Sequence, residues 1–204
     1  LKNEYLPKSR STSGLGSLPG GLKTYQYLIR LHTTTDLNID EIHEKGLAEV
    51  NRILSEMEKA KNSMGFNGDI KEFFEFIRNS PEQMPFTEPD QVIDHFDEIK
   101  LQVNNSLNTL FNLRPKATFE VRRTEAFREV SASAEYVPGS KDASRSGIFY
   151  VPIPDVSRYN KYADEALFLH EAIPGHHYQL SLQQENKQLP EFLHPESLGV
   201  FVEG

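Results

Sequence analysis

Cysteine is absent from this chain of 204 residues, which excludes disulfides, thiolate zinc sites and cysteine nucleophiles. A bound zinc ion would therefore need histidine and carboxylate ligands. A basic surplus is also missing, because 30 Asp and Glu oppose 22 Lys and Arg and give a net charge of -8. That balance argues against a general nucleic-acid-binding protein.

Long apolar runs are missing as well. No stretch is long enough to span a bilayer, and the polar first 20 residues lack the apolar region of a signal peptide. The sequence nevertheless begins with Leu1 rather than methionine. We therefore expect that an upstream segment has been removed or left out, and this leaves room for a processed targeting segment.

Apolar residues recur at helical spacing through most of the first 115 residues. After an irregular, glycine-rich lead-in over residues 1–21, the spacing predicts helices over 22–31, from Asn38 or Asp40 to about 61, from Asp69 to about 77, and over 88–113. Pro115 ends the last of these. The buried face of the second helix is predicted to consist of Ile39, Ile42, Leu47, Val50, Ile53, Leu54 and Met57.

The period changes to two after Pro115. Strands are predicted over residues 118–123, 132–137 and 147–151, and a helix then leads into His170. The expected class is α+β, mostly helical, with a small sheet before a zincin-like motif helix. We expect a helical N-terminal region over 1–115, and the sheet with the metal-motif helices, the start of a catalytic domain, over 116–204.

Three of the seven histidines, His170, His176 and His177, lie within eight residues and beside Glu171. Zinc is bound by neutral imidazoles and carboxylates that converge on one point. A glutamate next to a ligand histidine can act as general base on a water molecule. This cluster is the best candidate for a catalytic metal site in the sequence.

The spacing differs from the H-E-x-x-H motif, because the residue four positions after His170 is Pro174. On a regular helix His177 would lie in line with His170 but about 10 Å along the axis. Pro174 and Gly175 permit a kink or bulge that returns a later histidine towards His170. We prefer His176 as the second ligand and keep His177 as the alternative.

A third ligand should come from another element. Glu203 follows Glu171 by 32 residues, near the start of a second apolar helix over 198–203, and Glu196 is a weaker candidate. The other histidines are expected to be ordinary surface or core residues. They are His32, His43, His95 and His194.

The stretch from Leu169 to Gln179, with its Pro-Gly-His-His sequence, resembles the signature of the DUF885 family. These bacterial proteins often carry secretory or lipoprotein signals and resemble gluzincin-type zinc metallopeptidases. Other parts of the chain are similar to that family too, so the resemblance covers nearly all of it. They are Leu18 to Gly21 followed by Tyr25 and Leu28 to Arg30, then Ile42 to Val50, Ser144 to Val151, and Val202 to Gly204.

The resemblance implies roles for individual residues. His170, His176 and Glu203 would be zinc ligands and Glu171 the catalytic base; the variable residue after Pro-Gly-His favours His176 over His177. The segment from Gly147 to Val151 would be an edge strand that binds a peptide by β-augmentation. Its substrate contacts would be Gly147, Phe149 and Tyr150, with Arg145 near a substrate carboxylate, although a single arginine is also typical of a surface position.

These observations predict a Zn²⁺-dependent hydrolase, in particular a metallopeptidase acting on a peptide or small amide. The alternatives are a non-catalytic scaffold or binding protein with the same fold, and an inactive fragment of a larger enzyme, since the sequence stops inside the glutamate motif. Zinc is favoured over manganese or cobalt by ligand type. The resemblance suggests an extracytoplasmic location, periplasmic or lipid-anchored.

Overall fold

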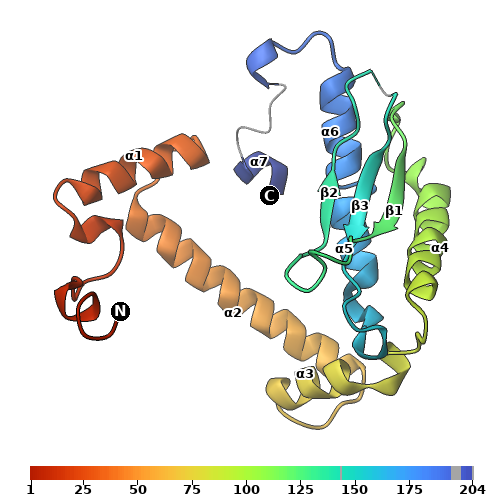
Figure 1. Ribbon diagram of the computed structural model, residues 1–204, viewed down its shortest axis with the longest axis horizontal. Coiled ribbons are helices and arrows are strands. Elements are labelled where there is room, and N and C mark those ends of the chain that lie inside the picture. The colour runs from red at the N-terminus through yellow and green to blue at the C-terminus, as the bar shows by residue number, and fades with distance from the viewer. Residues whose placement is uncertain (143, 194–198, 204) are drawn as a thin grey trace. The chain divides into compact units, whose positions relative to one another are not determined.

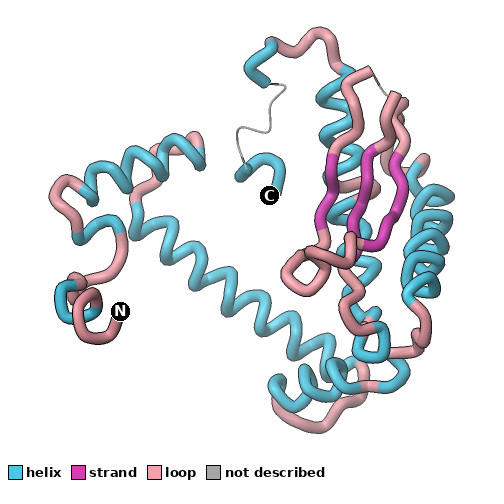
Figure 2. Tube along the Cα trace, viewed as in Figure 1, coloured by secondary structure: helices cyan, strands magenta, loops and turns pink. Residues whose placement is uncertain are grey.

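The computed structural model describes residues 1–142, 144–193 and 199–203 (Figure 1). Helices dominate these residues and accompany one small three-stranded mixed sheet (Figure 2), which confirms the α+β class. The chain forms two compact units, one from Leu1–Asn67 with Leu198–Gly204 and one from Gly68–Ser197. Among the described residues no helix combines the length and apolar content needed to cross a membrane.

The first unit consists of helices and turns. Two 3-10 turns, Leu6–Lys8 and Leu15–Ser17, precede α1 (Gly21–Thr33) and α2 (Ile39–Ser63), and α7 (Gly199–Glu203) belongs to the same unit. The side chain of Asn38 accepts a hydrogen bond from the Glu41 backbone N–H, and the Glu41 carboxylate accepts one from the Asn38 N–H. This capping box fixes the start of α2 at one of the two predicted positions.

The apolar face of α2 differs from the prediction. Five of its seven expected core residues are exposed, with exposed fractions from 38% to 53%. They are Leu47, Val50, Ile53, Leu54 and Met57. The expectation of a buried stripe is wrong for these residues, because a helical period shows which side chains share a face but not whether another element covers it.

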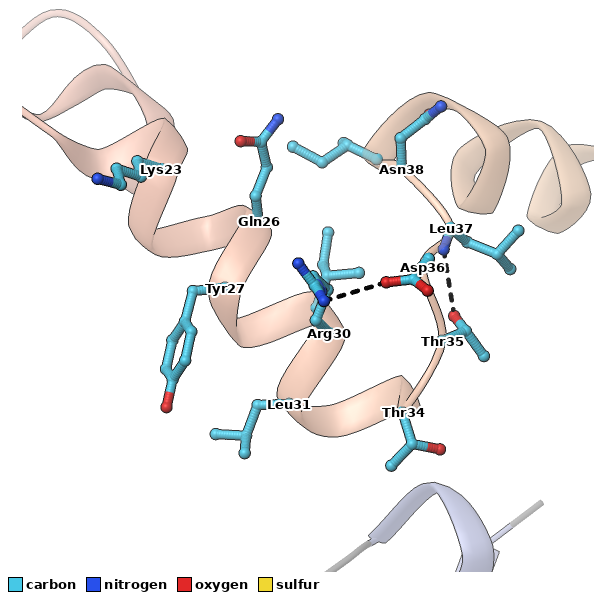
Figure 3. Close-up of a pocket in the computed structure, with 12 residues that line it drawn as sticks. Lys23, Gln26, Tyr27, Arg30, Leu31, Thr34, Thr35, Asp36, Leu37 and Asn38 are labelled. Carbon is cyan, nitrogen blue, oxygen red and sulfur yellow. Dashed lines mark hydrogen bonds and ion pairs between the residues drawn. The ribbon is translucent and has the colours of Figure 1, made fainter.

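A crevice of about 1070 Å³ lies in the first unit along α1, the turn after it and the start of α2 (Figure 3). An ion pair of 3.1 Å between Arg30 and Asp36 spans the turn. None of the residues predicted for the metal site lines this crevice.

The second unit carries the sheet and the motif. Its helices and strands are α3 (Ile70–Asn79), α4 (Pro89–Leu107), β1 (Phe119–Arg123), β2 (Glu135–Val137), β3 (Gly147–Val151), α5 (Asp164–Glu171) and α6 (His176–Glu185). Short 3-10 turns lie between and after them, at Pro81–Gln83, Val156–Arg158, Lys161–Ala163 and Glu191–Leu193.

The strand β3 lies in the centre of the sheet (Figure 1), parallel to β1 and antiparallel to β2. The prediction that residues 147–151 form an edge strand is therefore wrong, because β3 pairs with a neighbouring strand on each side. Four of its five residues are buried, and a continuous apolar run of this kind is typical of a strand covered on both faces. The edge positions belong to β1 and β2.

One hydrophobic core joins α4, the sheet and the motif helices. Phe96 of α4, Phe149 of β3 and Phe168 of α5 are fully buried, and the rings of Phe96 and Phe149 meet edge to face at 5.2 Å between centroids. Packing of this kind stabilises an aromatic pair beyond its buried area alone. The end of α5 is thus held on a rigid support.

The end of α4 differs from the expected position. The helix α4 ends at Leu107 rather than near 113, and Leu110, after its end, is 76% exposed. Asn, Ser and Thr side chains after residue 103 compete for backbone hydrogen bonds, as Thr109 does by donating to the Ser106 carbonyl. The division between the two compact units falls between Asn67 and Gly68, and within the second unit α4 packs against β1 and α5.

Candidate metal centre

The motif helix is interrupted as the Pro-Gly sequence predicted. The helix α5 ends at Glu171, and α6 begins at His176. Between them Ala172 leaves the helical region with φ -107° and ψ -99°, and the Ile173–Pro174 peptide is cis. The predicted break at Pro174 and Gly175 is confirmed, and the histidines after it belong to a new helix.

Gly175 lets the two helices approach closely. A Cβ atom at this position would lie 1.9 Å from the carbonyl oxygen of His170 and 2.3 Å from that of Leu169. Both distances are far shorter than any van der Waals contact, and the atoms in the way are backbone. Any other residue would push the start of α6 away from the end of α5.

This approach brings His170 and His176 together. Their ring centroids are 4.5 Å apart at an interplanar angle of 69°, and each offers a ring nitrogen within 4.8 Å of the other. Zinc–nitrogen bonds of about 2.0–2.1 Å hold two ligand atoms within roughly 4 Å of each other. The spacing of the pair is thus compatible with two ligands of one metal ion.

Glu171 is the last residue of α5 and adjoins His170 in the chain. Its side chain is in a protected position, since the residue is 8% exposed. His170 is exposed and His176 is half-buried. The motif thus combines one exposed imidazole, one half-buried imidazole and a buried carboxylate.

His177 lies in different surroundings. It is 2% exposed, and the centroid of its ring lies 4.4 Å from that of Phe119. Its Nδ1 lies 2.9 Å from the hydroxyl oxygen of Tyr136. Burial, followed by the positive charge of Lys100, lowers the pKa of His177 to about 4. The residue is therefore a neutral core histidine tied to β2, whereas His176 is the one that lies beside His170.

Tyr136 reaches His177 because Gly147 leaves room for it. A Cβ atom on Gly147 would lie 2.1 Å from the Tyr136 hydroxyl oxygen. Gly147 is thus a packing position against Tyr136, and its contact with a substrate stays a prediction. Sequence reasoning missed Tyr136, because its partner lies 41 residues further along the chain and no local pattern marks such a pair.

The other residues expected to bind substrate do not form one surface. Phe149 is completely buried and belongs to the hydrophobic core. Tyr150 is 9% exposed and lies under the guanidinium group of Arg128. Arg145 is exposed and donates a hydrogen bond of 3.1 Å to the carbonyl of Pro138, which ties it to its own loop.

Glu203, the expected third ligand, is the exposed last residue of α7 and belongs to the other compact unit. The weaker candidate, Glu196, lies outside the residues that the structure describes, as does His194.

A second cluster of titratable side chains surrounds Asp164, the first residue of α5. Asp164 is 3% exposed, accepts a hydrogen bond of 2.9 Å from Tyr159, and places its other oxygen 3.6 Å from Nε2 of His95. Burial raises the pKa of Asp164 to about 6 and lowers that of His95. Sequence reasoning treated His95 as an ordinary residue; its partner could be found only from the fold.

The comparisons with known proteins agree with this architecture. No curated protein matches the chain. A crystal structure from Colwellia psychrerythraea, described as a "putative lipoprotein", is similar with a TM-score of 0.87 and 25% sequence identity, over 97% of this chain and 35% of that chain. The present chain thus spans about a third of that protein's length. The family described as bacterial protein of unknown function matches residues 1–204, and the chain therefore belongs to the DUF885 family.

Proposed function

We propose that this chain carries the zinc-binding part of a zinc-dependent hydrolase that cleaves peptide bonds. The observation that carries the proposal is the convergence of His170 and His176 at the interruption between α5 and α6, with Glu171 next to one of them. Two imidazoles and a neighbouring carboxylate are the donor set and the base that metal-assisted hydrolysis requires.

Glu203 is proposed as the third protein ligand. The support comes from its sequence context, since Val202-Glu203-Gly204 resembles the start of a later glutamate motif. When bound, zinc would supply Lewis-acid chemistry and lower the pKa of a water molecule. Because the chain has no cysteine, histidine and carboxylate ligands are the set that it can offer to zinc.

Glu171 is proposed as the general base. In this role its carboxylate takes a proton from the attacking water and later gives that proton to the leaving amine. The support for this role is the position of Glu171 at the end of α5, next to His170 in the chain.

The substrate backbone is proposed to pair with β2 rather than with β3. The strand β2 lies at an edge of the sheet, and its Tyr136 contacts His177, the residue after His176. An extended peptide added at this edge would run beside the motif. An extracytoplasmic location also belongs to the proposal, supported by the lipoprotein description of the similar Colwellia protein.

Two variants test the proposal when zinc content and hydrolysis of a mixed peptide library are measured together. Glu171→Gln should keep zinc and lose hydrolysis by about a hundredfold or more, because the base is gone but the ligands remain. His176→Ala should lose both. A parent chain that binds zinc and cleaves no peptide would contradict the hydrolase assignment and favour the non-catalytic alternative.

A further inference from the structure

An apolar groove of about 480 Å³ lies between α4 and α5 in the second unit. On α4 its lining residues recur at helical spacing from Ile99 through Val103 to Leu107, so they form one stripe along the helix. On α5 the lining residues Glu165 and Leu169 are four positions apart and also share a face. The groove is therefore a trough between two helices.

The floor of the groove is buried and its walls are open. Ile99 and Leu107 are 4% and 2% exposed, whereas Leu169 is 44% exposed. The rim on α4 also includes the exposed Ser106. Exposed aliphatic side chains that line a concave surface can bury apolar groups of a ligand without rearranging the fold.

One end of the groove adjoins the candidate metal centre. Pro174 lines the groove and belongs to the turn before His176. Leu169 precedes His170, and successive residues of a helix point about 100° apart. Leu169 can thus face the groove while His170 faces the neighbouring side of α5. Glu165 lies one turn earlier, so its carboxylate is at the end away from Pro174.

We propose that this groove binds apolar side chains of the substrate peptide on one side of the bond that is cleaved, and that Glu165 selects for a basic group further along. The inference rests on the proposed function and deepens it by naming the substrate class. Three features support this occupant: the apolar floor, the position beside the motif and the single carboxylate at the far end. The volume also lies within the range of roughly 300–1,000 Å³ that is typical of ligand pockets.

The test is calorimetric binding of three capped tripeptides, leucine-leucine-lysine, serine-serine-lysine and leucine-leucine-glutamate. Binding is measured on the Glu171→Gln chain without added zinc, so that neither hydrolysis nor metal affects the result. Ser106→Trp fills the groove from its exposed rim, and Glu165→Gln removes the carboxylate. Leu101→Trp is the matched control, because Leu101 is 66% exposed on α4 and does not line the groove.

The leucine-leucine-lysine peptide is expected to bind roughly tenfold to a hundredfold more tightly than the serine peptide, as burial of a leucine side chain implies. Ser106→Trp should abolish that difference and Leu101→Trp should keep it. Glu165→Gln should remove the preference for lysine over glutamate. Circular dichroism of each variant checks that the fold is retained.

Equal affinity of the parent chain for the leucine and serine peptides would overturn the proposal. Unchanged affinity for the leucine peptide in a folded Ser106→Trp variant would also overturn it. A parent dimer that Ser106→Trp converts to a monomer would overturn it too, because the groove would then bind a second copy of the chain. A chain that fails to bind zinc but still binds the leucine peptides through the groove would refute the hydrolase and leave an apolar peptide site. Failure of the groove proposal and failure of the hydrolase proposal thus give different results.

Discussion

His176 and His177 are neighbours in the chain but lie in different chemical surroundings. His176 is half-buried beside His170, whereas His177 is 2% exposed and bonded to Tyr136. The residues alone left both histidines open as partners of His170, because the geometry of the Pro-Gly interruption cannot be derived from spacing. The structure separates them, since α6 begins at His176 and its next residue turns into the core.

Gly147→Ala tests the packing of Tyr136. The new methyl group would lie 2.1 Å from the Tyr136 hydroxyl oxygen, so the ring must move and give up its hydrogen bond to His177. We expect a loss of about 1–3 kcal/mol in the free energy of unfolding, measured by urea denaturation. Gly46→Ala, with nothing within 4 Å of the new atom, should be neutral or stabilising by up to about 1 kcal/mol.

The same substitution in a Tyr136→Ala background provides the control. Once the ring is removed, Gly147→Ala should have little further cost, because the clashing atoms are gone. An equal cost in both backgrounds would show that Tyr136 is not the obstacle.

Asp164 makes stability depend on pH. Burial raises the pKa of Asp164 to about 6 from an ordinary 3.8, so the folded chain binds a proton that the unfolded chain releases between these values. The stabilisation that this extra proton gives to the folded chain is fully present below pH 3.8 and is lost as the pH rises through 6. The lowered pKa of His95 leaves no imidazolium to offset the charge at neutral pH, and Tyr159 and Lys161 are the other groups that act on the carboxyl.

Asp164→Asn should therefore be more stable than the parent at pH 7, by up to about 3 kcal/mol. The asparagine oxygen can still accept the hydrogen bond from Tyr159. The advantage should shrink as the pH falls from 6 to 4, which urea denaturation at a series of pH values would show. A difference that stays constant with pH would mean that the carboxyl does not titrate in this window.

At the scale of elements, the sequence predicted most helices and all three strands. The boundaries of β3 agree with the prediction, and the capping residues Asn38 and Asp69 stand before α2 and α3 as expected. Position within the sheet could not be predicted, because strand order depends on pairing between distant segments. The edge position of residues 147–151 was implied by the family resemblance alone, and the pairing of β3 on both sides corrects it.

The interruption between α5 and α6 is the element on which the proposed metal site depends. Gly175→Ala would place a methyl group 1.9 Å from the carbonyl oxygen of His170, and the start of α6 would have to shift. We expect a loss of about 2 kcal/mol or more in the free energy of unfolding. Zinc affinity should fall with it, because His176 moves away from His170.

Isothermal titration with zinc and urea denaturation would measure the two effects of Gly175→Ala together. Gly46→Ala, in the interior of α2, is again the matched control and should leave zinc binding unchanged. Full zinc affinity in a folded Gly175→Ala variant would show that the metal does not need the close approach of the two helices.

At the scale of the whole molecule, the α+β class followed from the change of period after Pro115, but the compact units did not. Apolar spacing assigned α4 to a helical N-terminal region, whereas its core residue Phe96 packs on Phe149 of the sheet. The exposed apolar face of α2 likewise shows that apolar spacing does not tell whether another element covers a helix. Periodicity describes a single element, and the assignment of elements to a common core is a property of the folded chain.

The most direct test of the account is zinc content by elemental analysis of the chain purified without chelator, compared with His176→Ala and Glu203→Ala. His32→Ala, which removes an exposed histidine of α1, is the control. We predict about one zinc ion per chain in the parent and the control, and loss of zinc in both other variants. A parent that binds no zinc at neutral pH, or a His176→Ala chain that retains it, would contradict the proposed metal centre.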